Sequence, residues 1–222
     1  MNKNIVLIFI LFTIIFASCA SEETSNKPPV VTPSISIPKD TIVPKKEFGD
    51  RYSIVGDFNG DKISDTVYES YISSLTHKET YKILDDQDWE NNMDLIVKNS
   101  PVTRLYTTIP NVDTFLVTMQ DQQSGLFHYR NLGDINNDGK DEIGYAIKWL
   151  DYSNLNTYHV ITLQGNKFEE LFHFKINESF LYDNQEGLFD NGELIQQKDK
   201  NTILYKFQSD SATIETGEYK MN

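Results

Sequence analysis

The amino-acid sequence predicts an all-β domain, which we place at residues 48–222 of the 222-residue chain. Short runs of aromatic and β-branched residues alternate with Gly, Asn and Asp, which is the pattern of strands and turns. The glycine-containing segments 164–166 and 191–192 fit hairpin turns. No segment keeps a helical period over three or more turns, although residues 84–93 have room for one or two.

Five runs are the clearest strand predictions, because each combines β-branched and aromatic residues over the length of one strand. They are residues 66–72, 94–97, 114–118, 158–163 and 203–207. A domain of this length is also large enough to bury a core of its own.

An export signal and a tether precede this domain. Residues 1–18 combine Lys3, an apolar run from Ile5 to Phe16 and a small-residue cut site, which is the layout of a signal peptide. The apolar run is shorter than the about 20 residues that span a bilayer. Residues 19–47 are rich in Ser, Thr and Pro and predict a disordered, extended tether.

Cys19 is the only cysteine of the chain, so it can form neither an internal disulfide nor, by itself, a zinc site. Its context resembles a bacterial lipobox, with Phe16 in place of the commoner Leu. The resemblance implies that Cys19 is lipidated and anchors the protein to a membrane. Glu22 and Glu23 resemble the acidic export signal of Bacteroidetes lipoproteins, which implies the outer membrane and its cell-surface face.

The charge of the chain restricts its partners. It carries 33 acidic against 20 basic residues, for a formal net charge of −13. Such a surface repels phosphate backbones, so we expect no nucleic-acid binding and a preference for cations.

One internal repeat is present, between residues 54–71 and residues 131–148. Both copies place a glycine before an alternation of acidic and amide side chains. The matched pairs are Gly56 with Gly133, Asp57 with Asp134, Asn59 with Asn136, Asp61 with Asp138, Asp65 with Glu142 and Tyr68 with Tyr145.

Each copy offers oxygen ligands at loop positions 1, 3, 5 and 9, with a backbone carbonyl at position 7. Calcium prefers about six to eight such hard oxygens, and Gly60 and Gly139 allow the tight turn. An EF-hand is excluded because Tyr68 and Tyr145 occupy position 12, where it needs Glu. The predicted calcium ligands are Asp57, Asn59, Asp61, Ile63 and Asp65, and Asp134, Asn136, Asp138, Lys140 and Glu142.

The two loops resemble the FG-GAP, or VCBS, repeat of integrin α-subunit propellers and many secreted bacterial proteins. This resemblance implies up to two calcium ions and propeller-like blades, in a complete or incomplete propeller, or a related antiparallel β sandwich. Two departures stand against a regular propeller. Lys62 replaces a common glycine, and the separation of 77 residues exceeds a usual blade length. The alternative is a pair of Asn/Asp/Gly turns without metal.

No enzyme class is indicated by a motif. The sequence contains no G-x-S-x-G elbow and no phosphate-binding glycine loop. The histidines lack spacings such as HxxxH, and His159 and His173 lie in predicted strands, where we expect structural roles. A pair of carboxylates for glycoside hydrolysis stays open as an alternative, because what matters is the distance between the two groups in space and not their spacing in the sequence.

We therefore expect an envelope-tethered, calcium-stabilised β domain that binds a protein or a glycan and is not an enzyme. Trp89, Trp149 and Tyr152 are candidates for stacking on a sugar, and residues 148–156 are the first segment to examine. The alternatives are a polysaccharide hydrolase and a structural subunit of an envelope complex.

Overall fold

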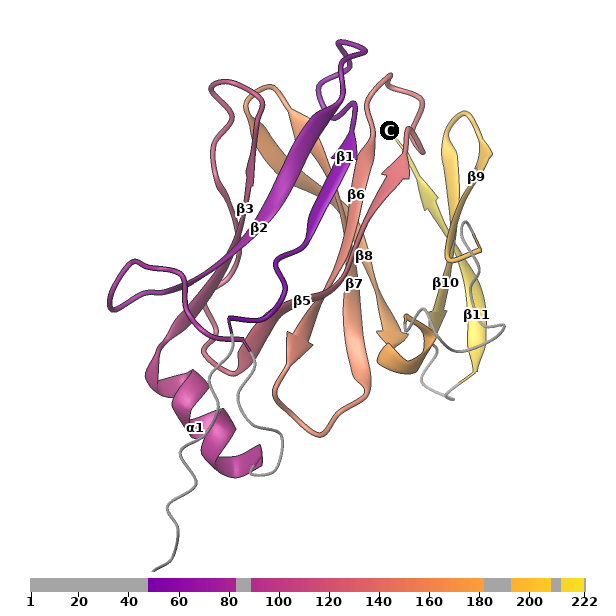
Figure 1. Cartoon of the computed structure of the whole chain (residues 1–222). Helices are drawn as coiled ribbons and strands as arrows, with labels where there is room; N and C mark the ends of the chain where they lie inside the picture. Colours follow the sequence, from indigo (N-terminus) through magenta and orange to yellow (C-terminus); the bar gives the residue numbers. More distant parts are fainter. Residues whose placement is uncertain (1–47, 83–88, 182–192, 209–212, 222) are drawn as a thin grey trace, which may run out of the picture. The chain divides into compact units, whose positions relative to one another are not determined.

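The computed structural model describes residues 48–82, 89–181, 193–208 and 213–221, all within one compact unit of residues 42–222. More than half of these residues lie in strands, which confirms the all-β prediction (Figure 1). The strands are β1 (Ser53–Gly56), β2 (Asp65–Ser73), β3 (Pro101–Thr107), β4 (Phe115–Thr118), β5 (Gln123–Gly133), β6 (Glu142–Trp149), β7 (Leu155–Gln164), β8 (Lys167–Asn177), β9 (Ile195–Asp199), β10 (Thr202–Gln208) and β11 (Ile214–Lys220). The helices are α1 (Trp89–Lys98) and the 3-10 turn η1 (Glu178–Phe180).

The strands make three antiparallel sheets, and each sheet follows chain order as a meander. The first sheet is β1-β2-β3-β4, the second is β5-β6-β7-β8 and the third is β9-β10-β11. Four-stranded meanders are the units of propeller blades, but a propeller has about four to eight of them. The described residues supply three sheets, so a propeller stays a prediction.

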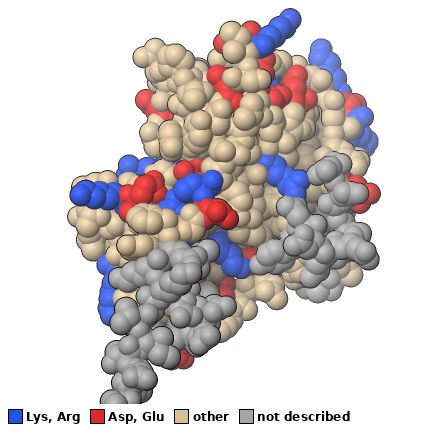
Figure 2. Space-filling model, viewed as in Figure 1, with Lys and Arg blue, Asp and Glu red and all other residues tan. Residues whose placement is uncertain are grey.

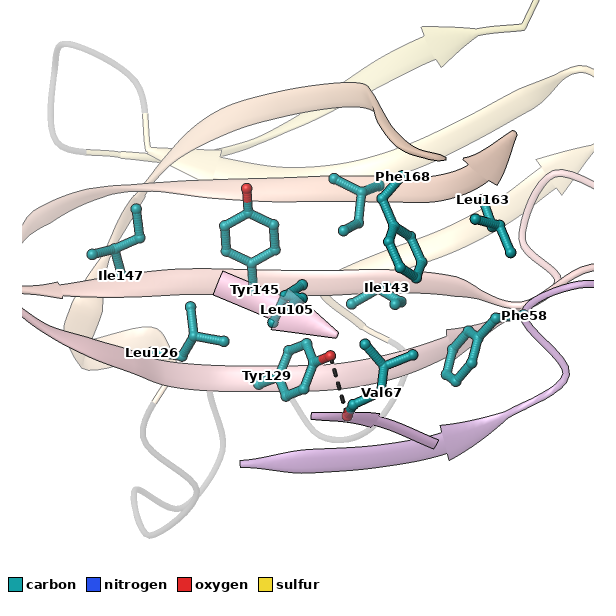
Figure 3. Packing of buried hydrophobic residues seen from close by; sticks show 11 residues of the cluster. Phe58, Val67, Leu105, Leu126, Tyr129, Ile143, Tyr145, Ile147, Leu163 and Phe168 are labelled. Carbon is teal, nitrogen blue, oxygen red and sulfur yellow. Dashed lines mark hydrogen bonds between the residues drawn. The ribbon is translucent and has the colours of Figure 1, made fainter. Parts of the chain in front are cut away.

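The second sheet is covered on both faces. On one face, Ile143 and Tyr145 of β6 pack in a core that also holds Val67 of β2 and Leu105 of β3. Figure 3 shows this core, in which the Tyr129 hydroxyl donates to the Val67 carbonyl at 3.4 Å. The first and second sheets are therefore joined by buried apolar side chains.

On the opposite face of the second sheet, Tyr158 and Phe172 belong to a second core that includes Ile203 of β10. Several aromatic rings of this core contact one another. Phe172 lies with its ring centroid 4.5 Å from that of Tyr219, and the rings of Phe174 and Tyr205 are 4.8 Å apart. The third sheet is held to the second largely by these aromatic contacts.

One strand prediction is wrong. Residues 94–97 lie in α1 and not in a strand, although Ile96 and Val97 are β-branched. Met93 and Ile96 are three positions apart, so they share one helix face, and both belong to a small cluster with Leu150. Tertiary packing of this face outweighs the strand preference of the short run.

The other predicted strands are confirmed, since 66–72, 158–163 and 203–207 lie within β2, β7 and β10, and 114–118 covers β4 and the residue before it. Gly165, with a φ of 60°, is part of the turn that joins β7 to β8. The predicted turn at 191–192, the signal at 1–18, Cys19 and the tether at 19–47 lie outside the described residues. Among the described residues, no helix has the length and apolarity to span a membrane.

Candidate functional site

The two predicted calcium loops occupy equivalent places in the fold. The first joins β1 to β2 and the second joins β5 to β6. In each, a strand ends at the glycine before position 1, and the next strand begins at the acid of position 9. Gly56 pairs with Asp65, and Gly133 pairs with Glu142. The sequence repeat is therefore also a structural repeat.

The two loops also share their internal hydrogen bonds. The acid at position 1 accepts two backbone N–H groups, while the side chains at positions 3 and 5 each accept one from two residues ahead. In the first loop these bonds are Gly60 and Lys62 to Asp57 (2.8 Å each), Asp61 to Asn59 (2.9 Å) and Ile63 to Asp61 (2.8 Å). In the second they are Asp138 and Gly139 to Asp134 (3.0 Å each), Asp138 to Asn136 (2.8 Å) and Lys140 to Asp138 (3.0 Å).

Positions 4 and 6 are left-handed in both loops. In the first loop they are Gly60 (φ 80°) and Lys62 (φ 68°), and in the second they are Asn137 (φ 58°) and Gly139 (φ 88°). Each loop thus has one glycine and one other residue at these two positions. Lys62, which replaces the glycine common at this position, therefore keeps the left-handed backbone of the loop. A residue with a Cβ pays about 1–2 kcal/mol of conformational free energy for this backbone.

The loops lie side by side and are bonded to each other. The Asp57 N–H donates to Asp141 Oδ2 at 3.0 Å, and the Asp141 N–H donates to the Asp57 carbonyl at 2.9 Å. Asn131 Nδ2 also donates to Asp141 Oδ2 at 2.8 Å. A Cβ at Gly56 would lie 2.3 Å from Asn131 Nδ2, so this close approach needs glycine. Sequence reasoning missed Asp141 and Asn131.

Asp65 carries an unsatisfied acceptor. The residue is 9 % exposed, and its Oδ2 is a buried oxygen without a hydrogen-bond partner. Burial and then the charges of Asp61 and Asp57 raise the pKa of this carboxyl. A buried orphan acceptor costs about 1–3 kcal/mol, more if charged, so this oxygen is suited to a cation.

Glu142 is the equivalent acid in the second loop and is fully buried. It accepts from the Ile135 N–H (3.0 Å), from Asn136 Nδ2 (2.8 Å) and from Thr162 Oγ1 (3.0 Å). Burial, with smaller effects from Asp138 and Asp134, raises its pKa from 4.5 to about 8 despite these bonds. The group keeps its proton at neutral pH unless a cation compensates its charge.

Without calcium, Glu142 should make stability fall as pH rises. Because the folded-state pKa of about 8 exceeds the ordinary 4.5, the folded state retains a proton that the unfolded chain releases. That stabilisation is complete below about pH 4.5 and is lost as pH rises through about 8. In excess chelator, the melting temperature should fall roughly 5 °C more between pH 5 and pH 8.5 in the wild type than in Glu142→Gln. Parallel curves in thermal denaturation would contradict this.

The acids of the loops do not already form a closed cage. Within the described residues, neither loop brings three carboxylate oxygens from different residues within 4.8 Å of one another. The side chains at positions 1 and 5 face N–H groups of their own loop. A cation in either loop would therefore require these side chains to rotate. Figure 2 shows acidic side chains gathered at the end of the molecule where β1 turns into β2.

A pocket of about 330 Å³ lies near the other end of the second sheet, where β6 ends and β7 begins. This end of β6 belongs to residues 148–156, the segment that the sequence favours for contact with a sugar. Trp149 lines the pocket and is partly buried against the first core. Tyr152 is 86 % exposed, and the side chain of Trp89 is outside the described residues. The pocket is lined by Gln120, Gln122, Trp149, Asp151, Leu155, Asn156, Thr157 and Lys175.

The three meanders and the paired loops define the class: an all-β protein with a repeated acidic loop between consecutive strands. No protein-family model matches the sequence, and no curated protein or solved structure matches it either. The function is therefore argued from the side chains of the chain itself.

Proposed function

We propose that the protein is a lipid-anchored, calcium-stabilised β domain of the outer membrane that binds a glycan or a protein and catalyses no reaction. Cys19 carries the anchor, and residues 19–47 hold the domain away from the membrane. Two calcium ions bind at Asp57–Asp65 and Asp134–Glu142. Calcium is scarce in the cytoplasm and abundant outside, so the anchor and the loops fit the same compartment.

The buried, unpartnered Asp65 Oδ2 at position 9 of the first loop is the observation that carries the calcium proposal. Its counterpart Glu142 is buried with a strongly raised pKa. Hydrophobic burial alone does not account for two acids at the same position of two repeats, whereas a cation at each would compensate their charge.

Calcium has a structural role in this proposal. The loops lie at the β1–β2 and β5–β6 turns, whereas the Trp149 pocket lies at the opposite end of β6. A ligand in the pocket would not touch the ions. Because Asp141 bonds the two loops together, calcium would instead fix the end of the molecule where the first and second sheets meet.

The pocket suits a glycan. The side-chain amides of Gln120 and Gln122 can donate to and accept from hydroxyl groups, and the Trp149 ring offers an apolar face. Of the described residues that line the pocket, Asp151 alone is acidic. A glycoside hydrolase needs two facing carboxylates, so the lining favours a binding module over the alternative of a hydrolase.

Calcium should raise the melting temperature of the full-length protein kept in detergent. A ligand at about 100 times its Kd adds about 2.7 kcal/mol, which for a chain of this size is on the order of 5–10 °C. The experiment is thermal denaturation in chelator and in millimolar calcium. Asp57→Asn with Asp134→Asn should remove the shift while keeping one acceptor oxygen at each position 1.

Asp121→Ala serves as the control, because Asp121 is an exposed acid outside both loops. It should keep the full calcium shift. The proposal fails if millimolar calcium leaves the wild-type melting temperature unchanged, or if the double variant shifts as far as the wild type.

A further inference from the structure

A separate cluster of metal-binding side chains lies on β7 and β8. His159 Nδ1 is 2.6 Å from Glu170 Oε2, and His173 Nδ1 is 2.7 Å from Glu170 Oε1. One ligand atom from each of the three residues lies within 4.8 Å of the other two. None of the three belongs to the calcium loops or to the pocket.

Strand register brings the three side chains to one face. His159 of β7 lies directly opposite His173 of β8, and Glu170 lies opposite Ile161. Directly paired residues share a face, and so do residues two apart on one strand, such as His159 and Ile161. All three side chains therefore project from the face of the second sheet that also carries Tyr145.

A β-bulge makes this possible. Between the pairs Val160–Phe172 and Ile161–Glu170, Leu171 is an extra residue on β8. In a regular strand, Glu170 and His173 would point to opposite faces, because they are three residues apart. The bulge puts both on one face and leaves Phe172 in the aromatic core behind. Bulges are enriched beside functional sites because they re-aim side chains in this way.

We propose that His159, Glu170 and His173 bind a zinc ion. Two imidazole nitrogens and one carboxylate oxygen are a zinc ligand set with a position left for water or an added ligand. The same nitrogens disfavour calcium, which prefers oxygen ligands, so the two kinds of site would take different metals. This site is independent of the proposed calcium role.

Side-chain rotations would be needed to bring the three residues onto one ion, since one ligand atom of each lies within 4.8 Å of the others. In a tetrahedral zinc site with bonds of about 2.0–2.1 Å, neighbouring ligand atoms are about 3.3 Å apart. Each Glu170 oxygen would have to retreat by about 0.6–0.7 Å from the Nδ1 atom that it now contacts. The His159 ring is held by stacking on Tyr145, with centroids 4.9 Å apart and planes at 11°.

The site is open to solvent on one side. The side chains are 23 % (His159), 39 % (Glu170) and 61 % (His173) exposed. An ion can therefore enter without unfolding the sheet. Since His173 and Glu170 are the more exposed members, their replacement should leave the fold intact.

The test is zinc titration of the full-length protein, made without a histidine tag, in detergent with saturating calcium. We expect one zinc ion per chain with a Kd in the micromolar range or tighter, measured by calorimetry. Cobalt substituted for zinc should give visible absorption bands from a nitrogen- and oxygen-ligated ion. His173→Ala and Glu170→Gln should each weaken zinc binding at least about tenfold and remove the cobalt bands.

His77→Ala is the matched control, because His77 is an exposed histidine outside the cluster, and it should bind zinc as the wild type does. Asp57→Asn with Asp134→Asn should also keep zinc binding, which separates this site from the loops. The proposal is overturned if 100 μM zinc does not bind or if His173→Ala binds zinc as tightly as the wild type. It is also overturned if Asp57→Asn with Asp134→Asn loses zinc binding while His173→Ala keeps it. The three residues would then form only a hydrogen-bonded ion-pair cluster.

Discussion

Replacing Glu69 by glutamine should lower the free energy of unfolding by about 3–5 kcal/mol, because it leaves a buried lysine without its counter-charge. The Lys82 Nζ is 2.6 Å from the Glu69 carboxylate, and the two side chains are 6 % and 0 % exposed. Burial lowers the pKa of Lys82, while Glu69 acts in the opposite direction. Loss of the carboxylate charge removes that compensation.

The same carboxylate also joins the first sheet to the second. It accepts from the Tyr52 N–H at 3.1 Å and from the Leu126 N–H at 2.7 Å. Gly125, with a φ of 83°, lets β5 approach, since a Cβ there would lie 2.4 Å from Glu69 Oε1. Glutamine has a single acceptor oxygen and can keep only one of these two N–H bonds, so Glu69→Gln removes one hydrogen bond together with the charge.

Urea denaturation gives the measurement, and a double variant gives the control. Glu69→Gln with Lys82→Met removes both charges and should regain the part of the lost stability that is due to the unpaired lysine, because a matched apolar replacement of a buried ion pair is often neutral. A loss below about 1 kcal/mol for Glu69→Gln, or a double variant as unstable as the single one, would show that the buried charge is not the cause.

The sequence predicts the strands and the repeated loops because both depend on local patterns. The β-branched and aromatic residues that mark 66–72 and 158–163 in the sequence lie in β2 and β7. The spacing within each loop places a glycine against the position 9 acid in both copies. Such features need only neighbouring residues to form, so a single sequence contains the information.

Features that depend on contacts between distant segments cannot be predicted from local sequence patterns. Residues 94–97 have strand composition but become helical through packing against Leu150. Asp141 bonds to Asp57, far away in sequence, and nothing in the spacing marks it. If the register of the hairpin turn continued without the bulge, His159 would lie opposite Phe172, so the histidine cluster depends on a bulge that the sequence of the hairpin does not predict.

Replacing Phe58 by alanine should destabilise the protein by about 3–5 kcal/mol and weaken calcium binding at the first loop. Phe58 stands at position 2 of that loop, is fully buried and belongs to the core between the first and second sheets (Figure 3). Its ring fixes the loop to the core, so Asp57 and Asn59 on either side keep their positions. The second loop is fixed in the same way by Ile135, but to the other core. Its calcium affinity should therefore change little.

Ile63→Ala provides the matched control, since Ile63 is an apolar residue of the same loop that is 66 % exposed. It should cost less than about 0.5 kcal/mol. Urea denaturation in chelator measures the packing loss, and calorimetric titration of calcium then shows whether one of two ions is affected. Equal stabilities for the two variants would mean that Phe58 does not anchor the loop. Because each loop is fixed to a different core, Phe58→Ala and Ile135→Ala should weaken different ions, and a uniform loss of both ions in either variant would contradict this arrangement.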